Sequence, residues 1–285
     1  MDSTVSRLKS ALYSLTERLV ELIRTVPIER LERYSGVLFI APDYYWGEAS
    51  AEQLNEQLQI KRDYDVWIQS FQLLFRGSSD DLTRRIKEYD KEVRTWIELG
   101  ENWSLTSNRD DNAEKMRAAS KQLEDLLAIV ASTDGERILV PDTNAIANES
   151  DPTKYRHIAG HNTYVFLLLP TVLAELDALK NAHRNPDFRE KIRRAIARIK
   201  GWRTQGALLA GVTVHKTVTV RAIGTEPDMK DSLSWLDKEN RDDRIIASVL
   251  EVQSDHPTSD VILVTEDVNL LNKADLASIA AREFS

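Results

Sequence analysis

The sequence of 285 residues contains no cysteine, and this absence excludes a disulfide framework, a thiolate zinc site, an iron–sulfur cluster and a cysteine nucleophile. It also lacks a long apolar run, since the longest, residues 164–170, is far too short to cross a bilayer. The N-terminal segment has no apolar core of the kind that a signal peptide needs. We therefore expect a cytoplasmic protein without a membrane partner.

The chain is acidic, with a net charge of −8, but the charge is unevenly placed. Residues 1–136 carry 18 basic and 25 acidic groups, whereas residues 137–285 carry 20 and 21. Overall acidity argues against a protein that coats nucleic acid through bulk charge, but it does not exclude a local basic patch. At roughly 150 residues per domain, the length favours two domains.

The first part of the chain repeats apolar residues every three or four positions, which is typical of amphipathic helices. This spacing predicts helices over residues 5–24, from the capping box at Ser50 to about residue 74, over 81–99, and up to residue 130. Trp67 and Trp96 lie in register with aliphatic and aromatic residues, so core packing is favoured over base stacking. We interpret residues 1–133 as an all-α domain for oligomerisation, partner binding or regulation.

The pattern changes after a turn cluster at residues 132–135. Apolar runs at 138–140, 164–169 and 261–265, together with an alternating segment at 212–220, are separated by helical patterns. Strands that alternate with helices predict an α/β domain with a largely parallel sheet over residues 134–285.

Acidic residues follow the predicted strands at the edge where parallel sheets bind ligands. Asp142 and Asp267 come directly after two strands, Glu175 lies six residues past a third, and Asp243 precedes a helix. Taken singly, each is explained by a helix cap, a turn or a solvated position. Together they form a carboxylate cluster that needs a hard cation such as Mg²⁺, and such a cation supports phosphodiester hydrolysis.

Four segments around these acids resemble the motifs of the PIN-domain nucleases: VPDTN at 140–144, LPTVLAELD at 169–177, NRDDRIIAS at 240–248 and ILVTEDVNL at 262–270. The resemblance spans about residues 137–280 and is closest to the nonsense-decay and ribosome-processing endonucleases and their bacterial relatives, in which a later Lys-Ala, here at 273–274, recurs. It implies a Rossmann-like, three-layer α/β/α domain. The segment 280–285 is short for the final strand of that fold.

The resemblance also implies roles for single residues. The catalytic and metal-binding acids would be Asp142, Glu175, Asp243 and Asp267, and the ion would be Mg²⁺ or Mn²⁺. The supporting residues would be Asn144, which orders the first motif, Thr265, whose hydroxyl supports the site, and Asp242, a neighbour or cap of Asp243.

A dense basic segment follows the second motif, at residues 180–203. We expect Arg189, Arg193 and Arg194 to bind the phosphates of an RNA substrate. A solvated helix face with Glu190 as the local acid partner is the alternative.

These features predict a metal-dependent endoribonuclease that hydrolyses single-stranded RNA. No histidine pair is placed for cyclic-phosphate chemistry, an aspartyl phosphatase would need an aspartate where Asn144 stands, and no G-x-x-x-x-G-K-[ST] loop occurs. The alternatives are a catalytically silent PIN fold that serves as a docking module, and a related nuclease that acts on DNA. We expect RNA as substrate and a second copy or a protein as partner of the helical domain.

Overall fold

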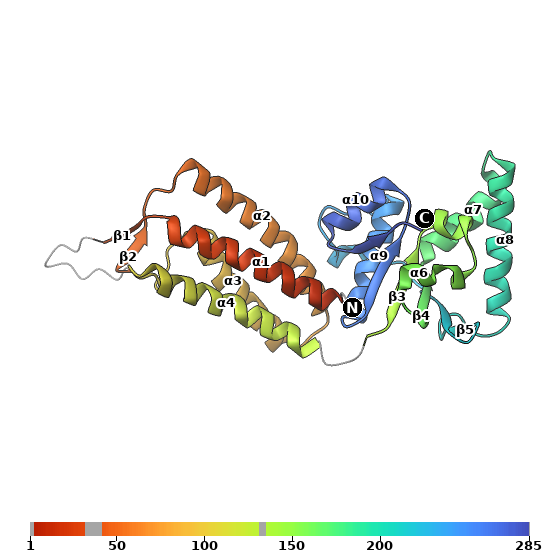
Figure 1. Cartoon of the computed structure of the whole chain (residues 1–285), viewed down its shortest axis with the longest axis horizontal. Coiled ribbons are helices and arrows are strands. Elements are labelled where there is room, and N and C mark those ends of the chain that lie inside the picture. The colour runs from red at the N-terminus through yellow and green to blue at the C-terminus, as the bar shows by residue number, and fades with distance from the viewer. Residues whose placement is uncertain (1–2, 32–41, 131–134, 285) are drawn as a thin grey trace. The chain divides into compact units, whose positions relative to one another are not determined.

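The computed structural model describes residues 3–31, 42–130 and 135–284. The chain divides into two compact units, one of residues 5–132 and one of residues 133–285 together with residues 1–4. The first runs from red to yellow-green in Figure 1 and is mainly helical, and the second runs from green to blue and is mixed α/β. In the described parts, the helices are too short or too polar to cross a membrane.

The described residues of the helical unit contain four long helices, placed close to where the apolar spacing predicts them. They are α1 (Thr4–Thr25), α2 (Ala51–Leu74), α3 (Asp80–Ile97) and α4 (Arg109–Val130). The predicted capping box begins α2, because Gln53 N donates to Ser50 Oγ over 3.2 Å and Ser50 N donates to Gln53 Oε1 over 2.8 Å. Each long helix therefore begins and ends within a few residues of its prediction.

The predicted helical character of this unit is confirmed, and the unit also contains one small strand pair that the apolar spacing did not predict. Two three-residue strands, β1 (Ile28–Arg30) and β2 (Tyr44–Trp46), pair antiparallel between α1 and α2. Strands this short show too few alternations for a period of two to be recognised in the sequence.

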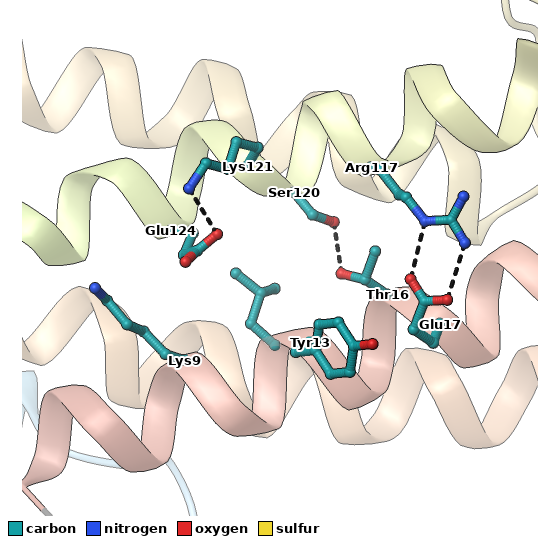
Figure 2. A pocket seen from close by; sticks show the side chains of 9 residues that line it. Lys9, Tyr13, Thr16, Glu17, Arg117, Ser120, Lys121 and Glu124 are labelled. Carbon is teal, nitrogen blue, oxygen red and sulfur yellow. Dashed lines mark hydrogen bonds and ion pairs between the residues drawn. The ribbon is translucent and has the colours of Figure 1, made fainter.

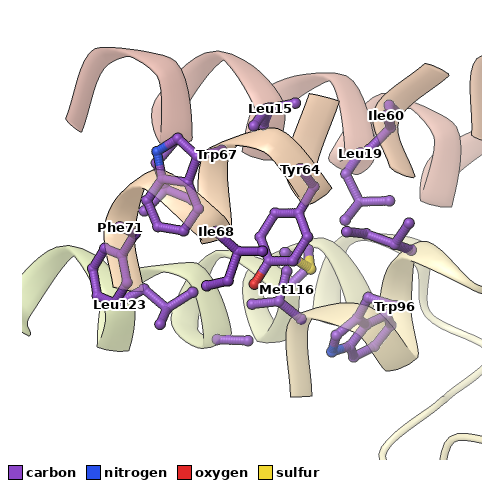
Figure 3. Close-up of a cluster of buried hydrophobic side chains, with 14 of the residues drawn as sticks. Leu15, Leu19, Ile60, Tyr64, Trp67, Ile68, Phe71, Trp96, Met116 and Leu123 are labelled. Atoms are coloured by element: carbon purple, nitrogen blue, oxygen red, sulfur yellow. The ribbon is translucent and has the colours of Figure 1, made fainter. Parts of the chain in front are cut away.

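Aromatic and aliphatic side chains fill the space between the four helices (Figure 3). Trp67 and Trp96 are buried, which confirms their predicted core role, and the Trp67 indole N–H donates to the Leu8 carbonyl over 2.9 Å. Tyr64 stacks on Trp67 with ring centroids 5.7 Å apart. The burial and mutual packing of these rings make this a packed core rather than a base-stacking surface.

Polar side chains also join α1 to α4 around a cavity of about 400 Å³ (Figure 2). Thr16 donates a buried hydrogen bond to Ser120 over 2.9 Å. Arg117 donates two hydrogen bonds to the carboxylate of Glu17, each over 2.9 Å. These groups are partnered across the two helices, so they hold the helices together.

The second unit, in its described residues, is built on a six-stranded sheet in the order β5-β6-β4-β3-β7-β8. The strands are β3 (Arg137–Pro141), β4 (Tyr164–Leu168), β5 (Val212–Val214), β6 (Val218–Ala222), β7 (Asp260–Val264) and β8 (Ala280–Arg282). β5 is antiparallel to β6, and the other neighbouring pairs are parallel. This sheet confirms the predicted α/β class.

Helices connect the parallel strands, because a parallel pair needs a crossover connection. They are α5 (Thr143–Asn148), α6 (Arg156–Ala159), α7 (Pro170–Ala182), α8 (Pro186–Arg203), α9 (Arg241–Asp255) and α10 (Val268–Leu276), with short 3-10 turns at Pro152–Tyr155 and Met229–Asp231. α5, α7 and α8 pack on one another, and α9 packs on α10. The chain order reverses at β3, which has β4 on one side and β7 on the other, so the crevice for a ligand is expected at the carboxyl end of β3.

Two of the edge elements of the sheet compare with the sequence predictions as follows: one differs and one agrees. The segment predicted from alternation at 212–220 is a hairpin, because His215 and Lys216 adopt positive φ of 51° and 63° and turn the chain back. The final strand β8 is three residues long, in keeping with the short C-terminal segment.

Candidate active site

Asp142 lies where the chain leaves β3, and it is the N-cap of α5. Its backbone N–H donates to the Val264 carbonyl over 2.9 Å, so the parallel pairing with β7 fixes its position. Its side chain accepts one hydrogen bond from Ala145 N over 2.6 Å and another from Thr265 Oγ1 over 2.5 Å. The residue is only 4% exposed, so its carboxylate is held in one orientation.

Burial raises the pKa of Asp142 above its ordinary value, although the hydrogen bonds from Thr265 and Ala145 lower it in part. The negative charges of Asp267 and Glu175 raise this pKa further. Three of the four predicted acids therefore act on one another electrostatically at one edge of the sheet.

Thr265 connects two of these acids. Its buried hydroxyl donates to Asp142 and accepts from the backbone N–H of Asp267 over 3.0 Å. Asp267 is the N-cap of α10, and its Oδ1 accepts from Asn269 N over 2.8 Å and Leu270 N over 3.3 Å. The predicted supporting role of Thr265 thus has a concrete geometry.

Glu175 extends from α7 toward the start of α5. Its Oε2 accepts from the Thr143 hydroxyl over 2.7 Å, and its Oε1 is 3.1 Å from Arg241 Nη1. The Glu175 side chain is 23% exposed, so this pair lies at the surface of the site.

Asp243 lies in the first turn of α9 and is buried. Its Oδ2 accepts from the backbone N–H of Asp237 over 2.9 Å, and its Oδ1 forms an ion pair with Lys273 Nζ over 2.7 Å. Lys273 also lies 3.3 Å from Asp242 Oδ2. Desolvation lowers the pKa of Lys273, but contacts with Asp243 and Asp242 outweigh it, and the pKa is raised.

The four acids offer carboxylate oxygens, which are suitable ligands for a hard cation. They are Asp142, Glu175, Asp243 and Asp267. In residues 3–31, 42–130 and 135–284, however, no three acidic or histidine side chains stand ready as a metal cluster. Two of these acids are instead in ion pairs, Glu175 with Arg241 and Asp243 with Lys273.

Sequence reasoning missed three partners of the acids, namely Thr143, Arg241 and Lys273. Thr143 directly follows Asp142, and Arg241 directly precedes Asp242 and Asp243. Both therefore lie inside segments that carry the PIN resemblance, but neither was assigned a role. Asn144 is exposed on α5. Its predicted role in ordering the first motif stays a prediction.

The predicted substrate-binding arginines lie on α8. Arg194 Nε is 3.2 Å from Glu190 Oε1, Arg193 Nη1 is 3.9 Å from Glu190 Oε2, and both arginines are exposed. Arg189 donates to the carbonyl of His183 over 2.6 Å and so closes the turn before α8. Within the described residues, no hydrogen bond or ion pair connects these arginines to the four acids.

The fold and the site agree with a comparison to known families. A family model described as PIN domain matches residues 139–285, just over half of the chain, and the chain therefore belongs to the PIN-domain family. The matched residues include all four acids, and proteins with this domain are generally nucleases. The predicted family is confirmed, whereas the nonsense-decay or ribosome-processing subtype stays a prediction. A comparison with curated proteins gives no match.

Proposed function

We propose that the PIN domain is a metal-dependent endoribonuclease that hydrolyses single-stranded RNA, with water as the nucleophile and a 5′-phosphate on the product. The observation that carries this proposal is the buried Asp142, whose pKa is raised by desolvation and by Asp267 and Glu175. A buried carboxylate with a raised pKa at the ligand-binding edge of a parallel sheet is typical of a functional site.

Asp142, Glu175, Asp243 and Asp267 would hold Mg²⁺ or Mn²⁺. When bound, the ion supplies a more acidic water and stabilises negative charge on the phosphoryl group. Thr265 orients Asp142, and Thr143 orients Glu175, by donating one hydrogen bond to each. Each carboxylate oxygen has two lone pairs, so both residues keep acceptor capacity for a cation.

Arg241 and Lys273 balance part of the negative charge when no ion is bound. We infer that a divalent cation competes with these two side chains for Glu175 and Asp243. The same ion pairs favour the alternative function, a PIN fold with a silent site that serves as a docking module, because carboxylates held by resident cations need no metal.

We propose that Arg193 and Arg194 attract the phosphates of the substrate, because they are exposed and share a single acid, Glu190. Arg189 contributes by fixing the turn between α7 and α8. Replacing both exposed arginines with alanine is expected to weaken RNA binding and to flatten its salt dependence. For the helical unit, we propose a protein partner or a second copy of the chain.

The test uses labelled single-stranded RNA and DNA of the same sequence, with Mg²⁺, Mn²⁺ or a chelator. We expect cleavage of RNA that chelation abolishes and that Asp142→Asn reduces by about a hundredfold or more. Asp177→Asn is the matched control, because Asp177 is an exposed acid of α7 that pairs with Lys180 outside the site. Activity that survives chelation, or 2′,3′-cyclic phosphate products, would contradict the proposal. Cleavage of DNA alone would favour the DNA alternative, and binding without cleavage would favour the docking module.

A further inference from the structure

A cavity of about 500 Å³ lies at the carboxyl end of β6. Aliphatic side chains from three places in the sequence form its walls: Leu173 of α7, Ile199 of α8, and Leu208, Leu209 and Ile223 of the segments around β5 and β6. Gly224 lies in its lining, where an added Cβ would be 3.3 Å from Leu209. This volume is in the range of about 300–1,000 Å³ that small-molecule sites occupy.

The cavity is on the same edge of the sheet as the acids. β6, β4 and β3 are parallel neighbours, so their carboxyl ends face the same way, and β6 lies roughly 10 Å from β3 at the usual strand spacing. α7 supplies Leu173 to the cavity and Glu175 to the acids. The segment that leaves the cavity at Ile223 reaches the acids at Asp237, whose N–H donates to Asp243.

The charge at the cavity is opposite to that of the acids. Lys200 and Arg203, in the last turn of α8, line the cavity and are exposed. Among the described residues, neither forms an ion pair, whereas Arg193 and Arg194 on the same helix share Glu190. Lys200 and Arg203 are therefore available to an anionic ligand.

We propose that this cavity is a nucleotide subsite, which receives an unstacked base of single-stranded RNA close to the phosphate that is cleaved. The inference rests on the proposed function. The aliphatic walls cover the faces of the base, and Lys200 and Arg203 contact the phosphates on either side of it. At the usual strand spacing, the roughly 10 Å between β6 and β3 is a span that neighbouring nucleotides of one strand can bridge. A base inside a duplex could not enter.

The test changes the charge at the cavity and the volume of the cavity in separate variants. All variants are made in the full-length chain with Asp142→Asn, so that RNA binds without being cut. Lys200→Glu with Arg203→Glu is expected to weaken binding of a fluorescent single-stranded RNA about tenfold and to lower the salt slope by roughly 0.7 per lost phosphate contact. Lys216→Glu is the control, because Lys216 is exposed in the turn at the opposite end of β6.

Gly224→Leu fills the cavity without a change in charge. We expect it to weaken RNA binding several-fold and to leave the salt slope unchanged. Gly201→Leu is its control, because a Cβ at Gly201 has no neighbouring atom within 4 Å. Near-native melting temperatures for the variants check that the domain remains folded.

The outcomes distinguish this subsite from the proposed function. Metal-dependent cleavage by the wild-type chain, with variants that bind RNA as tightly as the Asp142→Asn parent, overturns the subsite alone. Wild-type protein that neither binds nor cuts RNA overturns both. If the variants change the oligomeric state in sedimentation but leave RNA affinity unchanged, the cavity is a protein contact. That outcome also overturns the subsite.

Discussion

Two arginines of the helical unit and the buried Asp142 of the PIN domain lie in contrasting electrostatic surroundings. In the helical unit, Arg94 lies 2.6 Å from Asp65 and 2.9 Å from Asp90, and Arg18 is held in the same manner by two acids. In the PIN domain, Asp142 is buried beside other acids, and the donors to its carboxylate in the described chain, Ala145 N and the Thr265 hydroxyl, are neutral. Paired surface charges contribute little to stability, whereas a buried carboxylate without a cation costs folding free energy.

This difference indicates which interactions matter most in each unit. The helical unit depends on packed rings and tolerates changes in its charges, because those charges are partly solvated. The PIN domain also has an apolar core, but its candidate site depends on a few polar contacts at one edge of its sheet. Changes in apolar packing of the helical unit should therefore lower stability, and changes in single hydrogen bonds at the site should lower activity.

The largest expected effect is the loss of an aromatic side chain from the helical core. Trp96 is 2% exposed and packs edge-on against Trp46, with ring centroids 6.3 Å apart. We expect Trp96→Ala to lower the free energy of unfolding by about 3–5 kcal/mol because it leaves a large cavity. Chemical denaturation monitored by circular dichroism measures this loss.

The exposed Trp103→Ala is the matched control, because that side chain is 61% exposed. If cleavage of RNA by the Trp96 variant falls in parallel with its helical content, the PIN domain needs the helical unit for its own fold. That result would show that the two units do not fold independently.

The second effect concerns the hydroxyl that Asp142 depends on. Thr265→Val keeps the shape of the side chain but removes the donor to Asp142 and the acceptor for Asp267 N. Loss of a hydrogen bond to a charged group costs about 1.5–3 kcal/mol, so we expect a ten- to hundredfold loss in the rate of RNA cleavage. Thr265→Ser retains the hydroxyl and should restore most of the rate, and equal losses in both variants would contradict a hydrogen-bonding role.

Much of the architecture could be predicted from the sequence, and the charge balance of the site could not. The period of apolar residues places α1 and α4 because one face of each helix is buried, and the run at β4 predicts a strand buried on both faces. The ion pairs of Glu175 with Arg241 and of Asp243 with Lys273 join residues 66 and 30 positions apart. Such pairs depend on how helices dock on the sheet, which local spacing does not contain.

The third effect tests whether a resident cation competes with a metal ion. Lys273→Met removes the charge that lies against Asp243 and Asp242 but retains an unbranched side chain. We expect the metal-free protein to lose about 1 kcal/mol of stability, since two acids then face each other without a cation. The affinity for Mn²⁺ should rise about tenfold, as measured by paramagnetic titration.

Lys180→Met is the control for this substitution, because Lys180 forms an exposed ion pair with Asp177 on α7. A weaker affinity for Mn²⁺ in Lys273→Met would show that Lys273 positions Asp243 for the ion instead of competing with it.

The smallest effect is expected for the ion pair of Arg117 with Glu17 in the helical unit. The two hydrogen bonds from Arg117 lower the pKa of Glu17, with the coulombic effect of Arg117 and Arg24 added and burial opposing them. Because the folded-state pKa is depressed, the pair stabilises the fold above the unfolded pKa of about 4.3, and this contribution is lost as pH falls through the folded value. The Glu17 side chain is 39% exposed, so Glu17→Gln should cost no more than about 0.5 kcal/mol at pH 7. Melting curves of both proteins at pH 7 and below pH 4 measure this difference, which should shrink in acid, and a difference that grows in acid would contradict the assignment.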